Sequence, residues 1–480
     1  MKQKFHQNYL EYIMCIIALM VLSISYSFGQ ISFDNTIFRI PNTTATLEAV
    51  EIGDVNNDGL NDMAIVANKD YETNEHYVYI YKQLLEGGFS EPIKLPYLET
   101  YLYVSDIEIA DLNNDGLNDI AILYHFNGTV GIFYQQIDGS FSDIQEYTGI
   151  DNWYSGIRCG DLNNDGLIDI IGCNNTSDQT YRILYQKPEG GFSLSTISST
   201  INFFSRCPIE IGDLNGDGLN DIVMSCYSKI EILFQKAEYG INTDDVITLT
   251  LPHSYATKAT IGDVNNDGKN DIIVTCGGND DAAIMIYYQT GNGVFSNSNS
   301  KKIKAYDIPT PIHIVDFNCD GNNEIVVGHH GWHSITIFEK SIAGEYDSYV
   351  WYPSLYYSTP FSMAVGDINN DSLPDVIAVG NNGEINILYN TSKLLSIDEI
   401  DGELKSSHIT IYPNPTNAQL RIENYGLLLQ TEDYSIFNVM GQIILQGKLQ
   451  GKTTNINVET LANGMYYLKI AEQTVKFVKQ

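Results

Sequence analysis

The chain has 480 residues, of which 43% are hydrophobic and 11% aromatic, and its formal net charge is −34. This length predicts more than one domain, and the hydrophobic content together with 33 tyrosines indicates a globular chain that favours β-structure. The strong acidity and the lack of a basic patch argue against nucleic acid or an anionic membrane as the partner.

Residues 1–29 are predicted to form a signal peptide. Lys2 and Lys4 give a basic head, Ile13 to Ile24 form an apolar run, and Ser27 to Gly29 supply the small residues of a cleavage site. Because the run is too short to span a bilayer once it is cleaved, we expect an exported protein with no remaining transmembrane segment.

Seven copies of a nine-residue motif follow, separated by 57, 50, 52, 50, 53 and 51 residues. A regular period of about 50 residues indicates a propeller or a solenoid. Each copy has oxygen-bearing side chains at positions 1, 3, 5 and 9, and every copy but the last has glycine at position 6. The copies begin at Asp54, Asp111, Asp161, Asp213, Asp263, Asp316 and Asp367.

This motif is typical of a calcium-binding loop, because alternate side chains of a tight loop can converge and the carbonyl at position 7 can add another oxygen. Such hard oxygen ligands suit Ca²⁺ better than a soft metal. An EF-hand would need an acidic residue at position 12, where the first copy has Ile65. The remaining alternative is a metal-free Asn/Asp/Gly turn.

We expect up to seven structural Ca²⁺ ions. The predicted ligands are Asp54, Asn56, Asp58, Leu60, Asp62, Asp111, Asn113, Asp115, Leu117, Asp119, Asp161, Asn163, Asp165, Leu167, Asp169, Asp213, Asn215, Asp217, Leu219, Asp221, Asp263, Asn265, Asp267, Lys269, Asp271, Asp316, Asn318, Asp320, Asn322, Glu324, Asp367, Asn369, Asp371, Leu373 and Asp375.

Each repeat has room for four short strands and for no helix, which predicts an all-β, seven-bladed β-propeller. The last repeat stops at its third strand, Glu384 to Tyr389, whereas the segment from Ile31 to Ile40 resembles a fourth strand yet precedes the first loop. We therefore expect 31–40 to complete the seventh blade and to leave no open edge.

About three quarters of the chain resembles the FG-GAP or VCBS repeats, which are similar to the propeller of integrin α-subunits. The resemblance rests on the seven loops and on Gly-x-Phe-Ser elements such as Gly88 to Ser90 and Gly191 to Ser193. The resemblance implies Ca²⁺ between the first two strands of each blade, away from the ligand face. Two copies depart from the pattern, with Glu324 at position 9 and Ser372 at position 6. A non-glycine residue at positive φ costs about 1 kcal/mol or more, so the seventh site should be the weakest.

Aromatic residues gather before five of the seven loops, on the face that we expect to lie opposite the metal loops. They suit stacking on sugars or gripping a peptide, although they could instead seal one blade against the next. A second cluster, from His329 to His333, could bind a transition metal but is more often a polar loop. The predicted ligand-binding residues are Tyr101, Tyr103, Trp153, Tyr154, Phe203, Phe204, Tyr255, Trp332, His333 and Tyr357.

Six cysteines remain after cleavage. Cys226 and Cys276 occupy the same repeat position and are expected to be small buried residues. Disulfides are not expected, and Cys159 with Cys173 is the pair that best fits one.

Residues 30–395 are expected to form the propeller, and 396–407 are expected to be a polar linker. Residues 408–480 resemble the C-terminal sorting domain of type IX secretion substrates of Bacteroidota, through Tyr412 to Pro415, Ile436 to Gly441, Leu461 to Leu468 and Lys476 to Lys479. Alternating strands between turns predict a small β-sandwich. The resemblance implies handling by the type IX secretion machinery and a location outside the cell or on the outer-membrane surface, after passage through the periplasm.

The sequence thus favours a secreted, calcium-stabilised propeller that acts as a non-enzymatic binding or adhesion module for a glycan or an extracellular protein. The alternative from another class is a polysaccharide-active lyase or hydrolase on the same scaffold. A third alternative is a protein-assembly scaffold with no small ligand. An enzyme should have carboxylates outside the metal loops that converge on the open face. Asp280 with Asp281, and Glu72 with Glu75 and His76, lie on suitable loops without a named partner, so no catalytic residue is predicted.

Overall fold

The computed structural model divides into two compact units, Gly29–Leu394 and a C-terminal unit that begins at Leu395. It describes residues 31–392, apart from 42, 69–75, 98–102, 125–127, 151–155, 175–179, 201–207, 239, 253–254, 332, 342–343, 347 and 355–360. In the C-terminal unit it describes residues 409–412, 416, 418–424, 433–438, 443–449, 453–462, 464–470 and 473–479.

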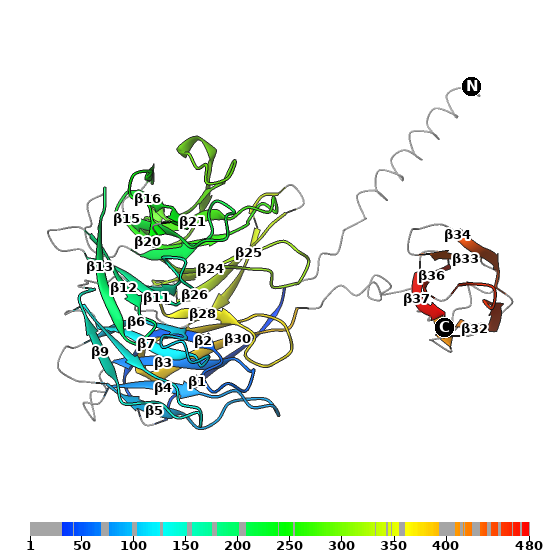
Figure 1. The fold of residues 1–480 in the computed structure, drawn as a ribbon, viewed down its shortest axis with the longest axis horizontal. Helices are drawn as coiled ribbons and strands as arrows, with labels where there is room; N and C mark the ends of the chain where they lie inside the picture. The colour runs from blue at the N-terminus through cyan, green and yellow to red at the C-terminus, as the bar shows by residue number, and fades with distance from the viewer. Residues whose placement is uncertain are drawn as a thin grey trace, which may run out of the picture. The chain divides into compact units, whose positions relative to one another are not determined.

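The described part of the first unit contains seven four-stranded sheets with antiparallel pairing throughout (Figure 1). The first three sheets are β2 (Thr46–Gly53), β3 (Asp62–Asn68), β4 (Tyr77–Tyr81) and β5 (Ile93–Pro96); β6 (Val104–Ala110), β7 (Asp119–Tyr124), β8 (Thr129–Phe133) and β9 (Gln145–Thr148); and β10 (Ile157–Gly160), β11 (Asp169–Asn174), β12 (Thr180–Gln186) and β13 (Phe192–Ser198). The fourth is β14 (Ile209–Gly212), β15 (Asp221–Cys226), β16 (Lys229–Leu233) and β19 (Ile247–Thr250), with an added hairpin of β17 (Gln235–Lys236) and β18 (Gly240–Ile241).

The remaining sheets repeat this order. The fifth is β20 (Ala256–Gly262), β21 (Asp271–Cys276), β22 (Ala283–Tyr287) and β23 (Ser300–Lys304), and the sixth is β24 (Pro309–Val315), β25 (Glu324–His329), β26 (Ser334–Glu339) and β27 (Ser348–Pro353). The seventh is β28 (Met363–Gly366), β29 (Asp375–Val379), β30 (Glu384–Asn390) and β1 (Phe33–Arg39). The helices in the described residues are short 3₁₀ turns: η2 (Asn279–Asp281), η3 (Asn297–Asn299) and η4 (Asn381–Gly383).

The first strands of the seven sheets form a closed ring. β2 contacts β6, β6 contacts β10, and the series continues through β14, β20, β24 and β28, which returns to β2. The prediction of an all-β propeller fold is therefore confirmed, and it follows from a repeat that supplies four short strands and one loop each time.

Hydrophobic clusters lie between neighbouring sheets and join them into one body. One cluster takes Val50, Met63 and Ile65 from the first sheet and Ile377 and Ile387 from the seventh. Comparable clusters lie between each of the other neighbouring pairs. Strands that are buried on both faces, such as β3 and β15, are consequently apolar along most of their length.

The ring is closed by the N-terminal strand, as the sequence predicts. β1 pairs antiparallel with β30 over its whole length, from Phe33 opposite Asn390 to Arg39 opposite Glu384. Phe33 also packs at the edge of the Phe317 ring, with 5.1 Å between the ring centroids, which ties β1 to the sixth sheet as well. The first and last segments of this unit thus form one sheet.

The C-terminal unit contains two sheets in its described residues. One is β31 (Ile409–Tyr412), β32 (Gln419–Asn424) and β35 (Thr453–Asn457), and the other is β34 (Ile443–Lys448), β33 (Asp433–Asn438), β36 (Gly464–Ile470) and β37 (Gln473–Lys479). A single hydrophobic cluster draws Leu420 and Ile456 from the first sheet and Ile436, Leu468 and Phe477 from the second. This shared core is what a small two-sheet domain requires.

The cysteine predictions need correction. Cys226 is disulfide-bonded, with a partner that the described side chains do not include, whereas Cys159 carries a free thiol. The suggested pairing of Cys159 with Cys173 is therefore wrong. Cys226 is buried as expected, and the repeat-equivalent Cys276 is free and buried.

Candidate calcium loops and ligand sites

All seven predicted loops join the first strand of a sheet to the second, so the predicted ligands lie at equivalent places around the ring. In every loop the residue at position 6 donates its backbone N–H to Oδ2 of the first aspartate, at 2.8 Å. The glycines at this position have φ between 80° and 85°, and Ser372 adopts 71°. The prediction that Ser372 takes a positive φ is confirmed.

The second loop illustrates how the backbone orders the side chains. Asp111 Oδ1 accepts N–H groups from Asn113 at 3.3 Å and from Asp115 at 3.2 Å, and Asn113 Oδ1 accepts the Asp115 N–H at 2.9 Å. Asp115 Oδ1 accepts the N–H of Leu117 at 2.9 Å. These bonds turn the loop tightly around its own acidic side chains.

The carboxylate at position 9 is the buried member of each set. Asp119 Oδ2 accepts the Leu112 N–H at 2.9 Å, and its Oδ1 accepts the Gln135 N–H at 2.8 Å, which anchors the loop to the end of the third strand. Burial raises the pKa of Asp119 to about 7, and repulsion by Asp115 and Asp111 adds to the increase. The same causes raise the pKa of Asp62 to about 6 and that of Glu324 to about 8.

The loops fit a hard cation in the chemistry of their donors. Each brings three carboxylates close enough to repel one another, together with an Asn side chain and a backbone carbonyl. Among the described residues no three His, Cys, Asp or Glu side chains form a metal-holding group by themselves. A cation in these loops would therefore be coordinated by the amide oxygen of the Asn at position 3 and the backbone carbonyl at position 7 as well as by carboxylates.

Position 8 has a structural role that the sequence analysis missed. Asn118 Nδ2 donates to the Asp54 carbonyl of the preceding loop at 2.9 Å, and Asn61, Asn220, Asn270 and Asn323 make the same bond. The third loop has Ile168 instead, and there Gln186 Nε2 reaches the Asp111 carbonyl at 3.2 Å. The recurrence of Asn at this position was the available signal. These bonds link neighbouring loops at six of the seven boundaries. At the last boundary, where Pro374 occupies position 8, Asn390 Nδ2 donates to the Phe317 carbonyl of the sixth loop at 2.8 Å.

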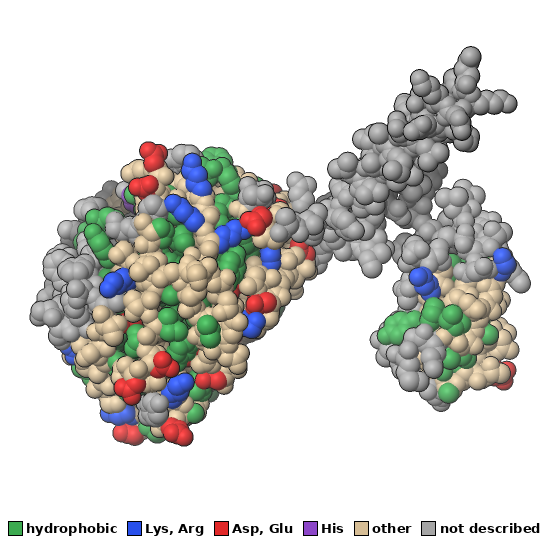
Figure 2. Space-filling view, turned by 90° about the horizontal axis from the view of Figure 1, so that it is seen from above, with side chains coloured by type: hydrophobic (Ala, Val, Ile, Leu, Met, Phe, Trp, Pro, Cys, Tyr) green, Lys and Arg blue, Asp and Glu red, His purple; other side chains and the backbone are tan. Residues whose placement is uncertain are grey.

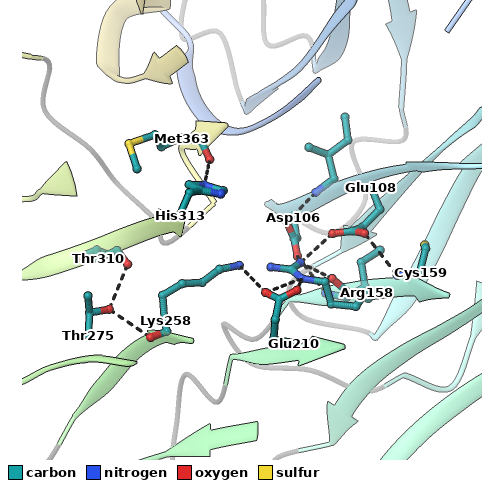
Figure 3. Close-up of polar contacts among 12 residues, drawn as sticks. Asp106, Glu108, Arg158, Cys159, Glu210, Lys258, Thr275, Thr310, His313 and Met363 are labelled. Carbon is teal, nitrogen blue, oxygen red and sulfur yellow. Dashed lines mark hydrogen bonds and ion pairs between the residues drawn. The ribbon is translucent and has the colours of Figure 1, made fainter. Parts of the chain in front are cut away.

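The central channel holds a charged cluster that was also missed (Figure 3). Arg158 on β10 donates to Glu108 at 2.8 Å, to Asp106 at 3.2 Å and to both oxygens of Glu210 at 3.2 Å. Burial raises the pKa of Asp106, Glu108 and Glu210, and the Arg158 guanidinium opposes that increase. The cluster lines a cavity of about 220 Å³.

Further polar groups complete the lining. The Lys258 ammonium lies 3.9 Å from Glu210 and 4.6 Å from the centroid of the Phe361 ring. His313 Nε2 lies 3.0 Å from the Met363 carbonyl, and burial lowers the pKa of His313 to about 4. Glu108, Arg158, Glu210 and His313 each stand three residues before the first aspartate of their loop, so comparing this repeat position would have found them.

Most of the predicted aromatic ligand residues lie outside the described residues, namely Tyr101, Trp153, Tyr154, Phe203, Phe204, Trp332 and Tyr357. Tyr103 and Tyr255 are 41% and 62% exposed. Tyr255 packs edge-on against Tyr227, with 5.5 Å between the ring centroids. His333 is described and has a φ of 48°.

The histidine run does not form a set of free imidazoles. His329 is 1% exposed, and its ring nitrogens lie 2.7 Å from the Tyr306 carbonyl and 2.8 Å from Thr336 Oγ1. With both nitrogens engaged, His329 has none to offer a transition metal. Its function in the structure is to hold two neighbouring segments together.

On the face that Figure 2 shows, the Lys and Arg side chains are scattered over the surface together with Asp and Glu. Among the residues that the structure describes, no helix is long and apolar enough to cross a bilayer.

Comparisons with solved structures find distant similarity to several proteins. An Agrocybe aegerita lectin that recognises non-reducing terminal N-acetylglucosamine is 16% identical, with a TM-score of 0.46 over 73% of this chain and 87% of the lectin. PorZ, a surface component of the type IX secretion system of Porphyromonas gingivalis, is 14% identical, with a TM-score of 0.42 over 90% of this chain and 59% of PorZ. Chaetomium thermophilum Sqt1, solved with the N-terminus of ribosomal protein L10, is 10% identical, with a TM-score of 0.44 over 74% of this chain and 98% of Sqt1.

Two family models match the sequence, while no curated protein does. The FG-GAP-like repeat matches residues 54–122, 111–172, 161–224 and 263–327, and the secretion system C-terminal sorting domain matches residues 410–480. The sorting domain marks the chain for export by type IX secretion to the cell surface or beyond. The chain therefore contains FG-GAP-like repeats and, at its C-terminus, a type IX secretion sorting domain.

Proposed function

We propose that this exported propeller is a calcium-loaded, non-enzymatic binding module that attaches to a glycan or an extracellular protein. The observation that carries the calcium part is the repeated loop, in which three mutually repelling carboxylates are held together by backbone N–H groups. A bound divalent cation would offset that repulsion and stabilise the folded ring.

The central channel does not favour the enzymatic alternative. Its carboxylates, which would be the candidates for acid and base groups, are tied to Arg158 by hydrogen bonds. Its cavity of about 220 Å³ is smaller than the range of about 300 to 1,000 Å³ that is common for ligand pockets. Asp280 and Asp281 lie in the short helix η2, in which no residue is buried.

The first test measures calcium and ligand binding together on the mature full chain. Metal content after dialysis should reach up to seven Ca²⁺ per chain, and Asp119→Asn should lower it by one, since that change removes a carboxylate from one loop. Asp143→Asn, at an exposed carboxylate outside the loops, serves as the control. Absence of bound calcium in the folded wild type would contradict the calcium part.

The ligand part is tested on a glycan array and on immobilised extracellular matrix proteins, with millimolar Ca²⁺ and again with a chelator. We expect saturable binding that is lost on chelation, because the loops position the strands that carry the surface. Folded, calcium-loaded protein that binds neither class of ligand would refute the binding module. Release of shortened sugar or protein fragments from the ligands would instead support the enzymatic alternative.

A further inference from the structure

A second aromatic site lies at the outer rim of the ring, away from the residues predicted from sequence. A crevice of about 370 Å³ is lined by Thr336, Tyr349 and Trp351 of the sixth sheet and by Tyr306, in the segment that joins β23 to β24. β27, which carries Tyr349 and Trp351, is the outermost strand of its sheet. The crevice is therefore open at the side of the propeller.

The rings in this crevice are exposed although they are large. Tyr349 and Trp351 stand two residues apart on β27, so their side chains point to the same face, and they are 42% and 49% exposed. The Tyr306 and Tyr349 rings lie 5.4 Å apart between centroids and are tilted by 56°. A side-chain hydrogen bond joins these two tyrosines and raises the pKa of Tyr349. The two tyrosines thus hold each other in place on one side of the crevice, and the Trp351 indole beside them is exposed to a ligand.

The floor of the crevice is built from buried polar groups. Thr336 lies opposite Trp351 in the strand pairing and is 1% exposed, and its hydroxyl lies 2.8 Å from His329 Nε2. The other ring nitrogen of His329 lies 2.7 Å from the Tyr306 carbonyl. A neutral imidazole that donates from Nδ1 and accepts at Nε2 satisfies both contacts. His329 therefore fixes Thr336 and the Tyr306 backbone in place.

A cation stands at the rim of the same site. The Lys304 ammonium lies 5.8 Å from the centroid of the Tyr306 ring, and Lys304 is exposed. No ion pair is formed by Lys304 within the described residues. In a chain with a net charge of −34, an exposed ammonium beside an aromatic crevice is a ready hydrogen-bond donor.

We propose that this crevice binds one pyranose residue of a polysaccharide chain, with the apolar face of the sugar stacked on the Trp351 indole and its polar edge turned toward Lys304. A pyranose combines a flat array of C–H groups with a rim of hydroxyls, which matches exposed rings beside a donor. The proposal rests on the binding module of the preceding section and names its ligand class and site.

The shape of the site favours a sugar over an added peptide strand. A peptide strand would lie along the free edge of β27 and would rely on main-chain hydrogen bonds. The features that distinguish this site are instead ring faces and a concave wall, with Tyr306 contributed from a different segment. Rings that face a pocket are the elements that hold a small flat ligand.

The test uses isothermal titration of the calcium-loaded full chain with cellotriose, chitotriose and trigalacturonate. At least one trimer should bind the wild type, and Trp351→Ala should weaken it about tenfold or more, because aromatic stacking contributes on that scale. Trp351→Phe, which keeps a smaller ring, should have an intermediate affinity. Ile37→Ala changes a residue of similar exposure, 53%, on the outer strand of the seventh sheet and should leave the affinity unchanged.

The outcomes separate the two proposals. If no trimer binds the wild type, or if Trp351→Ala binds as tightly as the wild type, the sugar site in the crevice is refuted. Glycan-array binding that survives Trp351→Ala would refute the crevice and keep the binding module. Near-ultraviolet circular dichroism of each variant confirms folding, and Trp351→Phe keeps the test decisive if the alanine variant does not fold.

Discussion

Replacing Arg158 with Met tests whether the channel cluster holds the ring together. The change keeps most of the apolar stem and removes the guanidinium that bonds Asp106, Glu108 and Glu210. The three carboxylates come from β6 and β14, on either side of β10, so the ion pairs cross two boundaries between sheets. The side chains of Arg158 and Asp106 are only 11% and 3% exposed, so water can replace little of the lost interaction.

The expected cost at neutral pH is about 3–5 kcal/mol, which is typical when one partner of a buried ion pair is removed and the other is left uncompensated. Burial already raises the pKa of Asp106, Glu108 and Glu210, and without Arg158 these pKa values rise further. A carboxyl group with a raised folded pKa stabilises the fold below its unfolded pKa of about 4 and loses that contribution as the pH rises through the folded pKa. The difference in unfolding free energy between wild type and Arg158→Met should therefore be larger at pH 8 than at pH 5.

The assay is urea unfolding of the calcium-loaded full chain at both pH values, followed by near-ultraviolet circular dichroism. Arg39→Met is the matched control. Arg39 lies on β1, the outer strand of the seventh sheet, where it pairs with Glu384, and the Arg39 side chain is 64% exposed. An exposed pair of this kind is worth less than about 1 kcal/mol. An Arg158→Met cost no larger than that of the control, or a cost that does not change with pH, would refute the role assigned to the cluster.

Three further changes probe the loops and the closure. Asn118→Ala removes the bond to the Asp54 carbonyl and should lower the unfolding free energy by about 1 kcal/mol, and no change in urea midpoint would count against that link. Ser372→Gly relieves a positive φ and should raise stability by about 1 kcal/mol and strengthen calcium binding at the seventh loop, as titration calorimetry against wild type would detect. Deleting 31–40 removes β1 and should lower the melting temperature of the whole ring, so an unchanged melting temperature would show that β1 is not needed for closure.

The propeller and its loops were predictable because their information is local and repeated. An Asp-x-Asn-x-Asp-Gly loop specifies its own turn through hydrogen bonds to its own backbone, as Asp111 does with Asp115 and Gly116. Recurrence of that loop then fixed where the strands begin. The N-terminal strand was predictable for a related reason, since 31–40 resembled a fourth strand and the last repeat lacked one.

The channel cluster and the outer crevice depend on contacts between repeats, which a single repeat does not encode. Arg158 differs in charge from its repeat equivalents Glu108 and Glu210, and only the ring brings the three together. Trp351 lies on β27, whereas Tyr306 lies in the segment that joins β23 to β24, and the two meet only through packing. Cys226 was expected to be a plain buried residue for the same reason, because its disulfide depends on a partner that the repeat pattern does not identify.

The shared last sheet also makes completeness of the chain a condition of folding. Phe33 is among the first residues of the unit to emerge and Asn390 among the last, so β1 has no strand to pair with until the entire repeat region has been made. A contact between strands so far apart in sequence forms late, because the entropy cost of closing the long loop comes before the contact can stabilise the fold. A chain truncated before β30 would keep an exposed edge on its incomplete last sheet and an unpaired first strand. Closure therefore requires the whole segment from β1 to β30, because β1 can pair with β30 only when both strands are present.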